Sequence, residues 1–188
     1  MTPNQAPRPS DTAAATATGP TTVLLTLSTV LVGLMAGLFF AFDVSVMPGL
    51  ADTGDDRTYV TAMRAFNSAI DGNALFGSAF LVALLAPATA AVLEFRRGRR
   101  ATALWTAAAA AAYLVVLVVT FTVNIPLNNE LAAGGAVEQL TDLSVVDRFK
   151  GTWVATNILR TVLCTAALTA LSRALLLHGR TTARTPSH

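Results

Sequence analysis

Three ionisable side chains interrupt long apolar stretches of this 188-residue sequence: Asp43, Asp71 and Arg160. Charged groups within a membrane span are costly, and they usually face the protein interior or a cavity. A carboxylate can remove a proton from an acidic C–H bond, and a guanidinium can stabilise the oxyanion that forms. These residues therefore predict a site for proton abstraction with charge stabilisation, in which at most one of the two aspartates is the base.

Aromatic and amide side chains share a helix face with the arginine. Trp153, Asn157 and Arg160 lie at positions i, i+4 and i+7, which places them on one side of a helix. Together with the other polar residues, they could line a partly buried pocket. This spacing predicts a binding face on the last apolar segment.

A second polar face precedes the second apolar segment, where Arg64, Asn67 and Asp71 lie at positions i, i+3 and i+7. Asn124 and Asn128 flank Pro126, and we expect this proline to end or bend the third helix. All these polar groups fall at a similar depth. The predicted substrate-binding residues are Asn67, Asn124, Asn128, Trp153 and Asn157.

A purely structural interpretation is open for each residue. Arg160 could pair with Asp43 or Asp71 and pin the helices together, Trp153 could be an interfacial anchor, and the asparagines could cap helices. A bundle of this size has no packing need for so many amides, so the set as a whole favours a functional site.

The composition points to a membrane protein. Hydrophobic residues make up 53% of the chain and charged residues 13%, against about 25% charged residues in soluble domains. Heavy use of alanine and arginine suggests a GC-rich bacterial genome. The single cysteine, Cys164, excludes an intrachain disulfide.

Four stretches with little or no charge are each long enough to cross a bilayer as a helix, for which about 20 residues suffice. The predicted fold is therefore all-α, an integral membrane four-helix bundle, with a short amphipathic segment near 56–67 on the outer side. We expect a disordered N-terminal tail over 1–20, a membrane domain over 21–177 with helices at about 22–46, 68–93, 101–123 and 153–176, and a cytoplasmic C-terminal tail over 178–188.

Arginines indicate the orientation. The turn 96–100 holds four of them, whereas the opposite loops hold most of the acids. The positive-inside rule then predicts a multi-pass protein of the cell membrane with both termini cytoplasmic. In so short a turn this cluster is a topology signal rather than a nucleic-acid site, so we expect a lipid bilayer and no nucleic acid as partner. Gly33 and Gly37 form a G-x-x-x-G motif, which leaves open a homo-oligomer or packing within one bundle.

Missing residue types exclude several cofactors. The two histidines, His178 and His188, fall in the expected tail, so a bis-histidine haem, a histidine-rich zinc site and a di-iron site are excluded from the bundle. Arg160 would compete with a hard cation for the two aspartates. We expect no metal and no cofactor.

The chain resembles the anthrone-oxygenase-like family of small integral membrane proteins. The resemblance runs from about residue 23 to residue 176, and its most specific stretch is Val-Asn-Ile-Pro-Leu-Asn-Asn-Glu-Leu at 123–131. Weaker stretches lie at 36–42, 46–50 and 62–67. The resemblance implies oxidation of anthrones to anthraquinones by O₂ without metal or flavin. Carried over by position, the site residues it implies are Asn124, Asn128, Trp153, Asn157 and Arg160, whereas Asp43 and Asp71 depart from the family pattern.

The leading hypothesis is a cofactor-independent oxygenase that converts a flat, phenolic, enolisable substrate to a quinone. Its partners would be a small aromatic or apolar substrate and O₂. Two alternatives are a membrane protein that binds or exports a small apolar metabolite without chemistry, and a structural subunit whose polar groups serve helix association.

Overall fold

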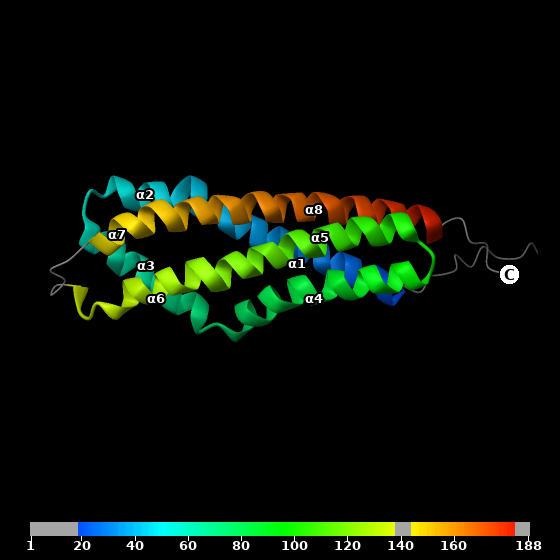
Figure 1. Cartoon of the computed structure of the whole chain (residues 1–188), viewed down its shortest axis with the longest axis horizontal. Coiled ribbons are helices and arrows are strands. Elements are labelled where there is room, and N and C mark those ends of the chain that lie inside the picture. Colours follow the sequence, from blue (N-terminus) through cyan, green and yellow to red (C-terminus); the bar gives the residue numbers. More distant parts are fainter. Residues whose placement is uncertain (1–18, 138–143, 183–188) are drawn as a thin grey trace, which may run out of the picture.

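The structure, a computed structural model, describes residues 19–137 and 144–182, and over these residues it is entirely helical (Figure 1). The expected tail over 1–20 lies almost wholly outside the described residues, as does His188. The α-helices are α1 (Pro20–Ala41), α2 (Met47–Asp52), α3 (Asp56–Asp71), α4 (Ala74–Arg96), α5 (Arg100–Val119), α6 (Ile125–Ala133), α7 (Ser144–Arg148) and α8 (Val154–Thr182).

Four continuous helical stretches are long and apolar enough to cross a membrane, as the sequence predicts: Pro20–Asp52, Ala74–Arg96, Arg100–Ala133 and Val146–Thr182. Three of them join two α-helices through a π-helical segment, at Phe42–Val46, Thr120–Asn124 and Phe149–Trp153. These three spans are longer than expected. Pro126 does not end the third helix; it lies in the first turn of α6, directly after a π-helical turn, where its missing N–H is tolerated.

The second span begins later than expected, because residues 68–71 belong to α3 and the chain turns at Gly72 and Asn73. Each of these helices has a side-chain N-cap. The carboxylate of Asp55 accepts from the backbone N–H groups of Arg57 and Thr58, and Asn73 Oδ1 accepts from the N–H of Phe76 at 3.0 Å. The amphipathic segment expected near 56–67 is thus α3, which buries Tyr59, Val60 and Met63.

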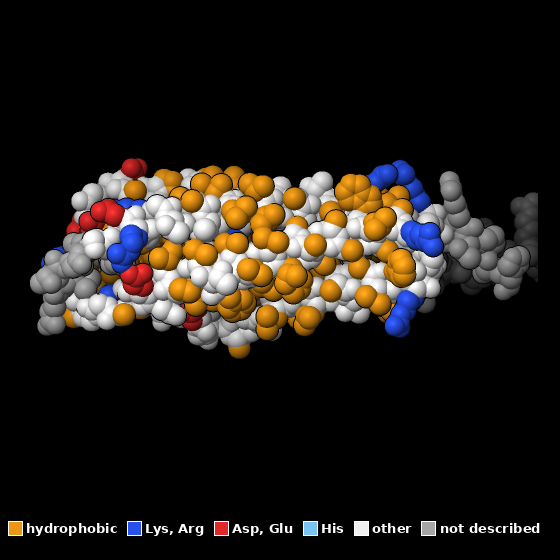
Figure 2. All heavy atoms as spheres, in the orientation of Figure 1, with side chains coloured by type: hydrophobic (Ala, Val, Ile, Leu, Met, Phe, Trp, Pro, Cys, Tyr) orange, Lys and Arg blue, Asp and Glu red, His pale blue; other side chains and the backbone are white. Residues whose placement is uncertain are grey.

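The spans α1, α4, α5 and α8 pack in a ring, in which α8 lies against both α1 and α5, and α4 closes the ring. Small side chains such as Ala83, Ala109 and Ala167 are buried where the helices approach one another. A Cβ added at Gly33 would lie 3.6 Å from Leu168 Cδ1 of α8, so this glycine of the G-x-x-x-G motif packs within the bundle. Large apolar side chains cover the visible outer face of the bundle (Figure 2).

Helices α2, α3, α6 and α7 gather at one end of the bundle (Figure 1). There a second apolar core forms around Tyr59, Met63, Phe149 and Trp153. A T-shaped ring contact between Tyr59 and Phe149 holds α3 against the start of the fourth span, where Phe149 also stacks on Trp153. This end is therefore a folded cap rather than a set of loops.

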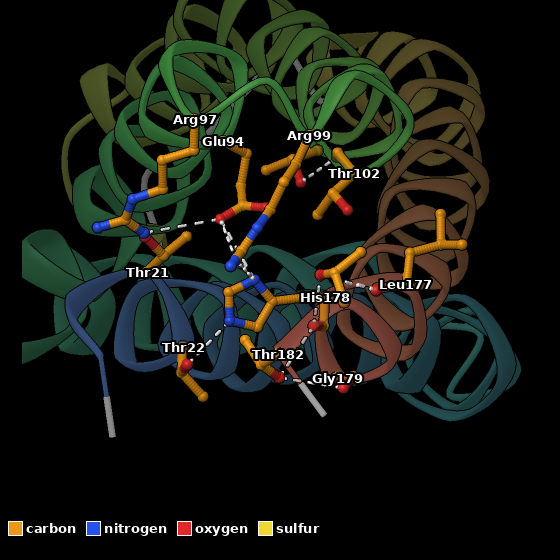
Figure 3. Close-up of polar contacts among 12 residues, drawn as sticks. Thr21, Thr22, Glu94, Arg97, Arg99, Thr102, Leu177, His178, Gly179 and Thr182 are labelled. Atoms are coloured by element: carbon orange, nitrogen blue, oxygen red, sulfur yellow. Dashed lines mark hydrogen bonds and ion pairs between the residues drawn. The ribbon is translucent and has the colours of Figure 1, made fainter. Parts of the chain in front are cut away.

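The opposite end contains an ion cluster, which we call the closed cluster: Glu94, Arg97, Arg99 and His178 (Figure 3). The Glu94 side chain is fully buried, and its Oε1 lies 3.2 Å from His178 Nδ1, 3.4 Å from Arg99 Nη1 and 3.7 Å from Arg97 Nη1. His178 Nε2 lies 2.9 Å from the hydroxyl of Thr22 in α1. The cluster thus ties α1, α4, α5 and α8 together.

His178 is the clearest departure from expectation at this end. The sequence placed it in a tail, but α8 continues to Thr182 and buries the imidazole. The reason is Glu94, which needs a partner for a carboxylate that no water reaches. Two arginines of the turn 96–100, Arg97 and Arg99, also form ion pairs with this carboxylate.

Candidate functional site

A cavity of about 320 Å³ lies at the capped end of the bundle, lined by residues of all four spans and of α3. Most of its wall is aromatic or aliphatic, with Phe39, Phe80 and Trp153 among the buried lining residues. Apolar walls with a few polar groups are typical of small-molecule sites, which span about 300–1,000 Å³. Its polar lining residues are Asn67, Asp71, Asn73, Thr120, Asn124, Asn128, Asn157 and Arg160.

Every site residue predicted from the sequence lines this cavity except Asp43. The side chains come from α3, from the second π-helical segment, from α6 and from the last span. Each π-helical segment carries a residue of the site or one that contacts it: Asp43 in the first, Asn124 in the second and Trp153 in the third. A π-helical turn widens the helix locally and is frequent at functional sites.

Arg160 is buried beside the cavity with its guanidinium between two aromatic rings. Its Cζ lies 4.4 Å from the centre of the Phe39 ring and 5.3 Å from that of Trp153. Its Nη2 donates to Asn157 Oδ1 at 2.7 Å, and its Nη1 donates to the hydroxyl of Thr120 at 3.4 Å. Cation–π contacts and neutral acceptors therefore hold this charge.

No carboxylate oxygen of the described residues lies within 4.0 Å of an Arg160 nitrogen. The ion pair with Asp43 or Asp71, which the sequence left open, is not formed. Arg160 keeps its positive charge beside a cavity, where an oxyanion would gain the most from it.

Asp43 acts on Arg160 through an amide. Its Oδ1 accepts from Asn157 Nδ2 at 2.5 Å and its Oδ2 accepts from the hydroxyl of Thr161 at 2.5 Å. The same Nδ2 donates to the backbone oxygen of Phe39 at 2.9 Å. These bonds direct the Asn157 oxygen toward Arg160. Asp43 thus lies behind the cavity wall, with both oxygens engaged.

Two more amides are fixed by the last span. Asn124 Nδ2 donates to the hydroxyl of Thr156 at 2.9 Å, and Asn128 Oδ1 accepts from Trp153 Nε1 at 2.9 Å. The Asn128 contact leaves its NH₂ group as the donor on the cavity side. Trp153 therefore serves as a wall and as an anchor for Asn128.

Two polar atoms beside the cavity are buried without a hydrogen-bond partner: Arg160 Nε and Asn124 Oδ1. One is a donor and the other an acceptor. An unsatisfied buried polar group costs about 1–3 kcal/mol. A ligand that offers an acceptor and a donor at this place would relieve that cost.

Asp71 and Asn67 lie at the rim. Asp71 is the last residue of α3 and is exposed, and Asn67 is partly buried one turn earlier. Of the two aspartates, Asp71 is the one that lines the cavity. It forms no hydrogen bond or ion pair with another described residue.

Several residues in the site were not singled out in the sequence. Thr120, Thr156 and Thr161 make hydrogen bonds to Arg160, Asn124 and Asp43 respectively. Thr161 lies four residues after Asn157, so helical spacing would have found it.

Among the described residues, no group of three or more His, Cys, Asp or Glu side chains lies close enough to hold a metal ion. Cys164 is buried in the bundle core.

A protein-family model described as anthrone oxygenase matches residues 62–170. The chain belongs to the anthrone oxygenase family. No curated protein matches the chain, and no solved structure does. The stretch common to the anthrone oxygenase family includes every predicted site residue except Asp43, which lies in the first span before the match begins.

Proposed function

We propose that this protein is a membrane-embedded, cofactor-independent oxygenase that oxidises an anthrone-like polycyclic phenol to the quinone with O₂. The observation that carries the proposal is Arg160, a buried cation without a carboxylate partner, stacked between two aromatic rings at the wall of an apolar cavity. Membership in the anthrone oxygenase family supports the reaction class.

The chemistry begins with a proton. In an anthrone, the methylene carbon opposite the carbonyl carries acidic C–H bonds, because the electron pair left behind delocalises onto the carbonyl oxygen. Asp71 is the base in this proposal, since it lines the cavity whereas both Asp43 oxygens are engaged. The oxyanion that forms lies against Arg160, with amide N–H groups as further donors.

The electron-rich enolate supplies the electrons that O₂ needs. A C–O bond forms at the carbon that lost its proton, and the resulting peroxide takes up a proton to give a hydroperoxide. Loss of the second proton from that carbon breaks the O–O bond and releases water. The products are one quinone and one water, so neither a metal nor a flavin is required.

The test is O₂ consumption by purified protein with anthrone as substrate, after treatment with chelator and removal of flavin. We expect quinone formation well above the spontaneous rate. The control is the folded double variant Asn124→Leu, Asn128→Leu, which keeps an apolar cavity but lacks its amides. Equal rates for wild type and this variant would sink the oxygenase proposal, and non-catalytic binding of an apolar metabolite would then become the leading function.

We also propose that the arginine-rich end faces the cytoplasm, in the cell membrane, with both termini inside. On the face shown in Figure 2, acidic side chains gather at the capped end, and the charged side chains visible at the closed-cluster end are basic. In a Cys164→Ala background, a cysteine at Ala136 should react with a membrane-impermeant reagent added outside cells, and one at Gly179 should not. The opposite labelling pattern would reverse the orientation.

A further inference from the structure

A second hollow adjoins the cavity at the capped end, and we call it the vestibule. Six of its eight lining residues have polar side chains, whereas most residues of the cavity wall are apolar, and it shares Asn67, Asp71 and Asn128 with the cavity. A ligand that occupies both would have an apolar body and a polar end. The vestibule residues are Arg64, Asn67, Ser68, Asp71, Gly72, Asn128, Asn129 and Ala132.

Arg64 is the cation of the vestibule. Its Nε donates to the backbone oxygen of Leu131 at 2.8 Å, and its Nη1 donates to that of Gly135 at 2.5 Å. These bonds hold the guanidinium against the C-terminal end of α6. Its Nη2 is buried and has no hydrogen-bond partner. A fixed guanidinium with one unsatisfied nitrogen is suited to an anionic oxygen, because both its charge and its geometry are already in place.

Asp71 does not neutralise Arg64. No ion pair joins the two side chains, and seven residues of α3 separate them, about 10 Å along the helix axis. Asp71 lies where cavity and vestibule meet, and Arg64 lies on the vestibule side. An anionic group beside Arg64 is therefore kept apart from the aspartate, and the amides of Asn128 and Asn129 are within the same hollow.

We propose that the vestibule binds a carboxylate substituent on the aromatic ligand, so that the substrate is a carboxylated polycyclic phenol. The carboxylate contacts Arg64, and the fused rings lie in the cavity against Trp153. This inference rests on the proposed function for the aromatic body of the ligand, but it does not depend on turnover.

The test uses two probes that O₂ cannot oxidise further, anthraquinone-2-carboxylate and its methyl ester. Binding is measured on the full-length protein in detergent by quenching of tryptophan fluorescence. A charge-assisted contact predicts that the acid binds about tenfold more tightly than the ester. Arg64→Gln should abolish this preference and leave the affinity for the ester unchanged.

Arg57→Gln is the matched control. Arg57 lies two turns earlier on α3 and likewise donates to a backbone oxygen, that of Val137, but it lines neither the cavity nor the vestibule. This variant should retain the preference for the acid. If Arg64→Gln does not fold, Asn129→Asp replaces it, because it adds a negative charge to the vestibule while leaving Arg64 in place, and it should weaken binding of the acid alone.

Equal affinities of the wild type for the acid and the ester would overturn the proposal, as would a preference that survives both Arg64→Gln and Asn129→Asp. Absence of binding by both quinones would overturn it as well. Since neither probe can be oxidised further, a protein that binds the acid selectively but fails to oxidise anthrone refutes the oxygenase function alone. A protein that oxidises anthrone but does not discriminate between the probes refutes the carboxylate subsite alone.

Discussion

The two ends of the bundle use arginine in opposite ways. In the closed cluster, the buried carboxylate of Glu94 is surrounded by Arg97, Arg99 and His178, and none of these four residues lines the cavity or the vestibule. At the cavity, Arg160 is buried without a carboxylate partner and lies beside about 320 Å³ of space. Matched charges fasten helices, whereas an unmatched charge beside a cavity is available to a ligand.

The difference lies in how each charge is compensated. Coulomb attraction to two arginines and to His178 offsets the desolvation of Glu94, although all three contacts go to Oε1 and Oε2 has no hydrogen-bond partner. Arg160 is held by neutral acceptors and two aromatic rings, which stabilise the cation without neutralising it. We therefore expect substitutions in the closed cluster to affect stability and those at the cavity to affect activity.

The largest effect is expected for Glu94→Gln. Removing one partner of a buried ion pair costs about 3–5 kcal/mol, because the remaining charges lose their compensation. The free energy of unfolding, measured in mixed micelles with increasing denaturing detergent, should fall by that amount. Glu130→Gln is the control: this residue pairs with Arg148 at the surface, where an ion pair contributes about 0–1 kcal/mol. Equal losses for the two variants would contradict the comparison.

The next largest effect is expected for the two aspartates, whose substitution by asparagine should lower the oxidation rate by different factors. Asp71→Asn should lower the rate of anthrone oxidation about a hundredfold or more, as expected for loss of a general base. Asp43→Asn keeps only one carbonyl oxygen to accept from Asn157 and Thr161, so it should disturb Arg160 indirectly and lower the rate only about tenfold. Steady-state kinetics on both folded variants provide the measurement. A larger loss for Asp43→Asn would exchange the two roles.

Arginine-to-lysine substitutions compare the two ends directly. Arg160→Lys should lower the rate by roughly tenfold to a hundredfold, because an ammonium cannot reproduce the planar, stacked guanidinium. Arg99→Lys retains a positive charge near Glu94 and should leave the rate within about twofold of wild type, because the closed cluster lies at the end of the bundle opposite the cavity. If Arg99→Lys were as inactive as Arg160→Lys, the assignment of stability to the closed cluster and of activity to the cavity would be wrong.

The smallest effect concerns Asp55, the N-cap of α3. The hydroxyl of Thr58 and the backbone N–H groups of Arg57 and Thr58 lower the pKa of this carboxyl. A lowered folded-state pKa contributes stability above the unfolded value of about 3.9, and this contribution is lost as the pH falls toward the folded value. At pH 7, Asp55→Ala should therefore speed hydrogen exchange of the α3 amides, and the difference from wild type should shrink below about pH 4.

Asp52→Ala serves as the control for this change. Asp52 is exposed at the end of α2, where a negative charge gains nothing from the helix dipole. Its removal should leave exchange in α3 unaltered. Slower or unchanged exchange in Asp55→Ala would show that the cap does not hold α3 over the cavity.

Much of the site could be predicted from the sequence. Charge is so costly in an apolar helix that Arg160 and the asparagines stand out, and helical spacing places Trp153, Asn157 and Arg160 on one face. Spacing could not distinguish a base from a positioning residue. Asp43 and Asp71 look alike in the sequence, and only packing shows that one lies behind the wall and the other at the rim.

The fold, too, could be predicted only in part from the sequence. Four apolar stretches predict four spans, but the pairing of Glu94 with His178 joins residues 84 positions apart and has no local signal. The break at Gly72 and Asn73 is not predicted from the sequence, although Asn73 is a good N-cap.

The three π-helical segments bear on how related sequences should be aligned. Each residue in an α-helix turns the chain by about 100°, so one extra residue within a span rotates every side chain beyond it by that angle. A relative that lacks a single residue in 42–46, 120–124 or 149–153 would still cross the bilayer, yet it would present a different stripe of side chains to the bundle interior. One-residue gaps inside a span are therefore meaningful in this family, and they mark where one lineage could have gained or lost the pocket in a single step.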